Sequence, residues 1–364
     1  MTVSSLLRRA ATGAGSAFLA LGLAAGAHAA DAPAGATTLG GKLFLDVSHL
    51  NAYRNGQRTA TSRNGADLKR FYLDLDHRFS DVWSAHLTTD INWARDSSPT
   101  DLWLKHAYLQ GAFSKALVLR FGSAPLPWAG FVNQWSGYRY VDKELVTRLK
   151  FGASADWGVH ALGALGDGGR LQYAASVISG SSFKHPRAGD RPDVEVRVAW
   201  QPSAHSVLAV GGYDGERALG GGNLPTYHTA RRWDAMAAYA TQRVRLGAQY
   251  FRAVDWNQVR SPRGDRAGGW SAWASVVLDP RWAVFARYDR ADTSASLDPS
   301  RRDRYANLGV AYRVSRQVQL AAVYKPSASA SRTSTSRSAP ATSWASTRRS
   351  AFELHGSARM SDPA

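Results

Sequence analysis

The feature that most constrains this chain is a period-two alternation of apolar and polar residues, which recurs along most of its length. In SVVLDPRWAVFARYDR (275–290), two such runs flank an Asp279-Pro280 turn, and Trp282 and Arg287 fall on opposite faces of the second run. Fifteen runs of this kind can be read, most of about nine to twelve residues. The period is typical of β-strands with two unlike faces, and the length is what a tilted strand needs to cross a bilayer.

The connections between the runs alternate between short and long. The predicted strands are 42–50, 68–79, 82–93, 102–113, 116–122, 157–165, 170–178, 193–201, 205–213, 231–241, 243–251, 269–278, 281–290, 304–314 and 317–325. Short turns at one end and long loops at the other are typical of outer-membrane barrels. The alternation holds only if LVTRLKFG (145–152) is not a strand and about 123–156 form one long loop that folds inward as a constriction. We therefore predict an all-β fold, a transmembrane antiparallel β-barrel of the sixteen-stranded type over residues 31–325.

The two faces of these runs differ in a consistent way. One face has aromatic residues toward its ends and small or aliphatic residues between them, as in Trp83 to Trp93 and Val194 to Trp200. The other face carries charged side chains in nearly every run. Since burying so many charges in a dry core would cost several kcal/mol each, we expect the apolar face to contact lipid and the charged face to line a wet interior.

The amino-terminal segment has the features of a signal peptide. Arg8 and Arg9 precede an apolar run, and Ala27-His28-Ala29 forms an A-x-A site. We expect residues 1–30 to be removed, with cleavage near Ala29 or Ala30, and the mature chain to reach the outer membrane. The chain has no cysteine, so no disulfide framework supports it, and its formal charge of +17 favours anionic partners. Export argues against nucleic acid as one of them.

Several stretches resemble one family of channels. RFYLDLDHRFSDVWSAHLTTD (70–90), LKHAYLQGAFSKALVLRFGSAPLPW (104–128) and TRLKFGASADWG (147–158) are similar to segments of the phosphate-selective and polyphosphate-selective porins of Gram-negative outer membranes. The resemblance covers most of residues 40–325. It implies a sixteen-stranded homotrimeric barrel that passes small anions, phosphate or polyphosphate, along arginine and lysine side chains without a cofactor.

The carboxyl end departs from that family. Its members finish with a strand that closes the barrel, whereas residues 326–364 are rich in Ser, Arg and Ala and show no alternation. A single-chain barrel is expected to have an even number of strands. We therefore expect the sixteenth strand to be lost, by a reading-frame error near Tyr324, and the tail to be disordered or out of frame.

Basic side chains on the charged face are the candidates for contact with anions, because a narrow passage lined by positive charge attracts and guides them. The wall candidates are Arg120, Arg170, Arg197, Arg232, Arg243, Arg245, Arg287, Arg313 and Lys325. The loop candidates are Arg139, Lys143, Arg148 and Lys150, together with Trp128 and Tyr138. The simpler explanation of any single arginine is an ion pair that holds the wall, with Glu195, Asp234 or Asp289 as the partner. The loop aromatics are more simply explained by packing against the wall.

Two other functions stay open at this point. Trp128, Trp135, Tyr138 and Tyr140 could stack on sugars, which would make the chain a general or carbohydrate porin. An outer-membrane enzyme would need a serine and a histidine facing one another, and the sequence contains no G-x-S-x-G. The ten histidines lack the spacing of metal ligands, so we expect no metal. The sequence favours a passive porin for small anions over an enzyme.

Overall fold

The computed structural model describes residues 33–54, 57–58, 63–93, 101–187, 189–218, 228–256, 261–332 and 342–360. The expected signal peptide lies outside these residues and stays a prediction. The strands are β1 (Thr37–Arg54), β2 (Gln57–Arg58), β3 (Arg63–Arg78), β4 (Trp83–Trp93), β5 (Asp101–Ser114), β6 (Leu117–Pro125), β7 (Ala155–Leu165), β8 (Leu171–Ile178), β9 (Asp193–Ser203), β10 (Ser206–Gly215), β11 (Ala230–Ala240), β12 (Val244–Val254), β13 (Arg266–Val277), β14 (Trp282–Asp292), β15 (Arg302–Arg313), β16 (Val318–Arg332) and β17 (Thr342–Met360). The helices are α1 (Ala129–Ser136), α2 (Leu145–Arg148) and the 3₁₀ turn η1 (Asp167–Gly169).

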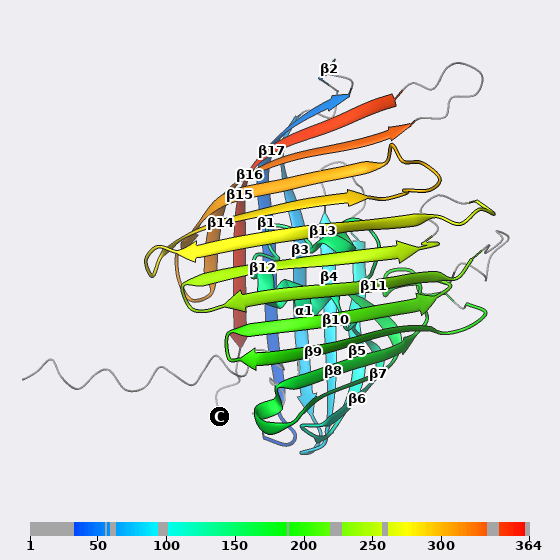
Figure 1. Ribbon diagram of the computed structural model, residues 1–364. Helices are drawn as coiled ribbons and strands as arrows, with labels where there is room; N and C mark the ends of the chain where they lie inside the picture. The colour runs from blue at the N-terminus through cyan, green and yellow to red at the C-terminus, as the bar shows by residue number, and fades with distance from the viewer. Residues whose placement is uncertain are drawn as a thin grey trace, which may run out of the picture.

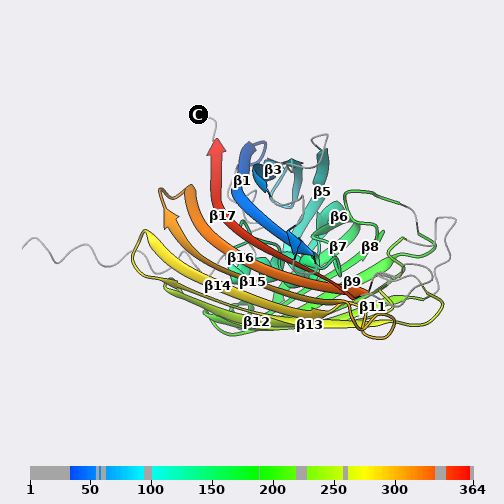
Figure 2. The same ribbon diagram turned by 90° about the horizontal axis from the view of Figure 1, so that it is seen from above.

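These strands form one antiparallel sheet that closes on itself. From β3 to β17 each strand pairs with the next in the sequence, and β17 then pairs with β1, which pairs with β3. Figure 2 shows β17 and β1 side by side, with the start of β1 next to the end of β17. β2 contains only two residues and pairs with the end of β1. All fifteen predicted strands are present, so the predicted β-barrel is confirmed.

The expectation of a lost final strand is wrong for this structure. Residues Thr342–Met360 form β17, which pairs with β16 through Val318↔Gly356 to Arg332↔Thr342 and with β1 through Leu39↔Met360 to Arg54↔Ala345. The sheet therefore continues beyond residue 325. The physical reason is that an open barrel would leave the edges of β1 and β16 unpaired, which hydrocarbon does not tolerate, whereas backbone pairing needs no side-chain alternation.

The outer and inner faces follow the predicted alternation. Trp282 is 45% exposed and Val198, Leu308 and Tyr288 are likewise exposed on the outside, whereas Asp289 is fully buried on the inside. Outer aromatic rings meet across strands, with ring centroids 5.1 Å apart for Trp233 and Tyr250, 5.4 Å for Trp270 and Tyr288, and 4.6 Å for Trp282 and Tyr312. The apolar exterior and polar interior are those of a membrane barrel.

The segment from 126 to 154, which we call the constriction loop, connects β6 to β7 and carries α1 and α2. In Figure 1, α1 lies within the curve of the sheet, behind β10 to β12. It packs on a part of the inner wall made of small or apolar residues, including Ala199, Ala209 and Met236. Trp128 lies against Gly211, where a Cβ atom would be 2.8 Å from the indole, so only glycine fits there. No helix within the described ranges is long and apolar enough to span a membrane.

Candidate functional site

The constriction loop is held by basic side chains of the inner wall that donate to its backbone carbonyls. Arg245 Nη1 donates to the carbonyl oxygens of Gln134 (3.1 Å) and Trp135 (3.3 Å). Lys325 Nζ donates to the Val141 oxygen at 2.7 Å, and Lys69 Nζ donates to the same oxygen at 2.5 Å. These contacts join the loop to opposite sides of β1, because Lys325 lies on β16 and Lys69 on β3.

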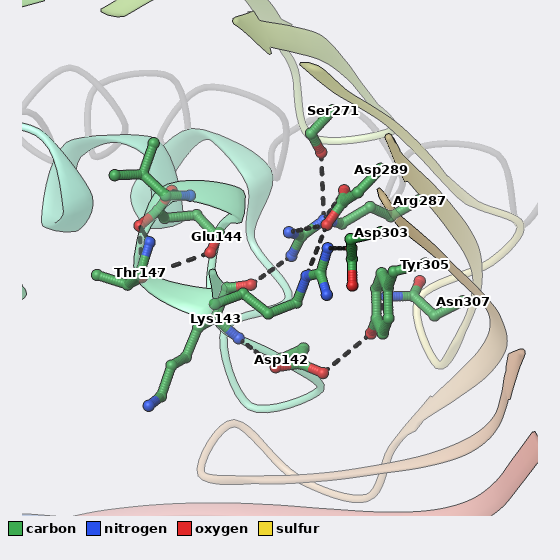
Figure 3. Close-up of polar contacts among 12 residues, drawn as sticks. Asp142, Lys143, Glu144, Thr147, Ser271, Arg287, Asp289, Asp303, Tyr305 and Asn307 are labelled. Atoms are coloured by element: carbon green, nitrogen blue, oxygen red, sulfur yellow. Dashed lines mark hydrogen bonds and ion pairs between the residues drawn. The ribbon is translucent and has the colours of Figure 1, made fainter. Parts of the chain in front are cut away.

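Arg287 on β14 anchors the second half of the loop. Its Nη1 donates to the Lys143 carbonyl at 2.5 Å, while Asp289 accepts from its Nε and Nη2 at 2.8 and 2.7 Å. The same aspartate accepts from Arg148 Nε at 2.9 Å, and Arg148 also bonds to Asp303. Figure 3 shows this arrangement, with the loop on one side and the strands that carry Arg287 and Asp303 on the other. Charge-assisted bonds of this kind fix geometry well.

Asp142 lies beside this anchor and accepts a hydrogen bond from the Tyr305 hydroxyl at 3.1 Å. Burial alone would raise its pKa, but the positive charges of Lys325, Lys69 and Arg287 outweigh burial and lower the pKa well below its usual range. The carboxylate is therefore ionised at every physiological pH. It balances positive charge at the point where the loop meets the wall.

A third anchor lies deeper, at Arg232 on β11. Its guanidinium is 1% exposed; Nε donates to Asp234 at 2.8 Å, Nη2 lies 3.4 Å from Glu195, and Nη1 donates to the Phe151 carbonyl. Glu195 in turn accepts from the backbone N–H of Trp128 at 3.1 Å, which is the residue before α1. This buried triad therefore fixes both the start and the end of the constriction loop.

Short-range caps give the loop its local shape. Glu144 is the N-cap of α2, and its carboxylate accepts from the backbone N–H groups of Val146 and Thr147, at 2.6 Å each. Gly137 ends α1 with a φ of 84°, a left-handed conformation that glycine adopts without strain. Its missing side chain also leaves room for Arg245, whose Cδ would lie 3.2 Å from a Cβ atom.

Two basic residues of the loop are not used in these anchors. Arg139 and the Lys143 ammonium are half-buried, and neither makes a hydrogen bond or an ion pair with any residue that the structure describes. In Figure 3 the Lys143 side chain runs away from Arg287 and Asp289. Burial and the positive charges of Arg70, Arg139 and Lys184 lower the pKa of Lys143 to about 8, even though Asp142 acts in the opposite direction. Positive charge is therefore in excess at this point.

The wall that faces these two residues adds further basic groups. Arg70 on β3 donates to Asp90 at 3.0 Å and to Asn92 at 3.2 Å, and Asn92 also accepts from Lys184 at 3.5 Å. Lys184 comes from the connection between β8 and β9 and lies 3.3 Å from the centroid of the Trp103 ring. We call Arg70, Arg139, Lys143 and Lys184 the basic cluster. Its members come from the constriction loop, from strand β3 of the wall, and from the long connection between β8 and β9.

The predicted wall residues take three different positions. Arg232, Arg245, Arg287 and Lys325 hold the constriction loop. Arg120 and Arg197 are buried against the wall, with Arg120 bonded to Gln110 at 2.8 Å and the Arg197 guanidinium 3.6 Å from the Phe131 centroid. Arg170, Arg243 and Arg313 are exposed in, or at the end of, the short connections.

The predicted loop residues divide in the same way. Arg139 and Lys143 join the basic cluster, and Arg148 pairs with Asp289 and Asp303. Lys150 is exposed, and its carbonyl accepts from Trp256 Nε1 at 3.0 Å. Trp128 is 1% exposed, and Tyr138 stacks on Phe285 with centroids 4.1 Å apart.

The sequence pattern did not single out Arg70, Lys184 or Lys69 as site residues. The alternation in RFYLDLD places Arg70 on the face opposite Phe71 and could have identified it. A β-bulge between Leu68 and Phe71 explains why the adjacent Lys69 also reaches the loop. Lys184 lies in an irregular connection and has no such signal. No group of His, Asp or Glu able to hold a metal ion occurs in the described part of the chain.

Comparison with solved structures supports the fold. The chain is similar to an anion-selective porin from Comamonas acidovorans, with a TM-score of 0.61 and 12% identity, covering 89% of this chain and 99% of that chain. It is similar to the outer membrane channel DcaP of Acinetobacter baumannii, with a TM-score of 0.59 and 12% identity over 88% and 98% of the two chains. A trimer form of OmpT, an outer membrane protein of Vibrio cholerae, matches with a TM-score of 0.52 and 13% identity over 87% and 99%. No protein-family model and no curated protein sequence matches this chain. At such low identity the likeness establishes an outer-membrane barrel fold.

Proposed function

We propose that this chain is an outer-membrane porin for the passive diffusion of small anions, with phosphate or polyphosphate as its preferred solute and a homotrimer as its working form. The observation that carries the proposal is the basic cluster, where Arg139 and Lys143, which have no ion-pair partner among the described residues, lie near Arg70 and Lys184. An uncompensated positive field in a narrow interior concentrates anions and excludes cations. The similarity to an anion-selective porin and to a trimeric outer membrane protein supports it.

The loop aromatics give less support to a carbohydrate porin. Trp128 and Tyr140 are buried, and Tyr138 is stacked on Phe285, so these rings pack within the protein. Sugar stacking needs an exposed aromatic face. The basic cluster, by contrast, has side chains with no partner in the described structure.

One serine and histidine pair bears on the enzyme alternative. His160 Nδ1 lies 2.8 Å from Ser176 Oγ, but both side chains are 2% exposed, and Nε2 faces the Gly122 carbonyl at 3.2 Å. A catalytic triad needs an accessible serine and a carboxylate that orients the histidine. The pair fits a structural contact between β7 and β8 better.

The phosphate preference is tested by adding phosphate to single channels that conduct chloride in a planar bilayer. We expect millimolar phosphate to lower the chloride current, because a dianion occupies the basic cluster longer than chloride does. A chloride current that does not respond to phosphate would contradict the proposed phosphate preference. It would not contradict anion conduction.

The pH dependence of selectivity follows from the pKa of Lys143. Since this pKa is about 8, the ammonium is charged below that pH and neutral above it. We expect the preference for chloride over potassium to fall as the pH rises from about 7 to about 9, measured as the zero-current potential in a KCl gradient. In Lys143→Gln the preference for chloride should be weak and should not change with pH over this range. In Lys143→Arg it should be as strong as in wild type at pH 7 and should not change with pH. A wild-type profile that matches Lys143→Arg would contradict the prediction.

A further inference from the structure

A row of arginines lies on the outer face of the barrel, at the end that carries the long loops. The residues of this outer arginine row are Arg231, Arg252, Arg266, Arg290 and Arg304, and all of them are exposed. They lie at the loop-side ends of β11 to β15. Their register places them on the same face as the outward Trp233, Tyr250 and Tyr288.

The row lies just beyond the aromatic girdle. Along β12 Arg252 follows Tyr250 by two residues, and along β14 Arg290 follows Tyr288 by two residues, so each arginine is one pleat farther toward the loops. Aromatic belts mark the level of lipid headgroups. Arginine on the outer face is costly at the centre of the bilayer and cheap at its boundary. The row is therefore at the level of the lipid phosphates.

Within the described residues, most of the arginines in this row have no acidic partner. Arg290 and Arg304 are direct register partners on neighbouring strands, and like charges in that position repel. Within the described residues, neither of them makes a hydrogen bond or ion pair, and the same holds for Arg252. The nearby acids Asp214 and Asp292 are already engaged, by Arg231 at 2.9 Å and by Arg302 at 3.6 Å. The described residues therefore leave Arg252, Arg290 and Arg304 available to an anion from outside the chain.

An apolar groove of about 590 Å³ lies beside the row on the outer face of β9 to β13. Its floor includes Ala237 and Ala248, and Trp200, Tyr250 and Trp270 stand around it. Small side chains between large rings leave an open apolar depression. Tyr250 lines the groove and precedes Arg252 by two residues, so the groove reaches the strand segment next to Arg252.

We propose that this face binds a phosphorylated lipid of the outer leaflet, with the lipid phosphates on Arg252, Arg290 and Arg304 and an acyl chain in the groove. A guanidinium group can donate two hydrogen bonds to the oxygens of one phosphate. An acyl chain in the groove covers its apolar surface and separates it from the polar headgroups. The inference requires an outer-membrane barrel with its long loops outward. It does not depend on which ion crosses the interior.

The test uses the full chain purified in detergent, with lipid binding measured by native mass spectrometry. The probes are diphosphorylated lipid A and the same lipid with both phosphates removed. The variant Arg252→Gln/Arg290→Gln/Arg304→Gln is expected to bind diphosphorylated lipid A about 100-fold more weakly than wild type. The matched control is Arg243→Gln/Arg281→Gln/Arg316→Gln, which removes three exposed arginines from the short connections. It should bind lipid A as wild type does.

Three results would overturn the proposal. One is binding of diphosphorylated lipid A by the triple variant as tightly as by wild type. Another is equal binding of the dephosphorylated lipid by wild type, a comparison that needs no variant. Displacement of lipid A by millimolar inorganic phosphate would assign the arginines to free phosphate. An unchanged zero-current potential in the triple variant is expected, because these arginines lie outside the barrel. Failure of the lipid proposal is therefore distinguishable from failure of anion conduction.

Discussion

Replacing Arg139 and Lys143 together by glutamine is expected to lower the chloride-to-potassium permeability ratio about tenfold. These two side chains carry the positive charge of the constriction loop that no acid within the described residues pairs with. Their loss leaves Arg70, which is bonded to Asp90, and Lys184, which lies over Trp103. The measurement is the zero-current potential across a planar bilayer in a KCl gradient.

The matched control is Arg243→Gln/Arg313→Gln. It removes the same formal charge from the exposed short-connection end, where water and salt screen the field. This control should change the permeability ratio less than twofold, by the same screening. Equal effects of the two double variants would mean that overall charge, and not the basic cluster, determines selectivity.

Replacing Arg232 by methionine is expected to lower the free energy of unfolding by about 3–5 kcal/mol, because it leaves two buried carboxylates without their cation. Asp234 and Glu195 are 0% and 2% exposed, so water does not replace the lost partner. The Phe151 carbonyl also loses its donor, which frees the end of the constriction loop. Equilibrium urea unfolding of the barrel folded in detergent measures the change.

Two companion variants separate this mechanism from a general effect of mutation. The first is Arg231→Met, at the preceding residue, whose side chain is 71% exposed. It should change the unfolding free energy by less than about 0.5 kcal/mol. Adding Glu195→Gln and Asp234→Asn to Arg232→Met should recover part of the loss, because no buried charge then remains. If the triple variant were less stable than Arg232→Met, unpaired charge would not be the cause.

The fold was readable from the sequence because a barrel imposes its period on every strand. Trp282 faces outward and Arg287 inward, as the alternation in 275–290 indicates. β17 was missed because its residues show little alternation, and its position is set by the unpaired backbones of β16 and β1. Side-chain pattern therefore predicts strands well only where each face has a distinct environment.

Only part of the candidate site could be predicted from the sequence. Arg232 with Asp234 and Arg287 with Asp289 lie two residues apart on one face, so their pairing follows from the sequence. Which basic residues stay unpaired depends on where the constriction loop crosses the wall. That path is set by contacts over long sequence separations, such as Lys69 with Val141 and Arg245 with Gln134. No local pattern encodes it.

Anion conduction is proposed to follow from the positive charge of Arg139 and Lys143 inside the barrel, which no acid within the described residues pairs with. The most direct test is the zero-current potential of single wild-type channels in a planar bilayer that separates concentrated from dilute KCl at about pH 7. We expect a potential with the sign of chloride permeation. A potential with the sign of potassium permeation, or one near zero, would contradict it.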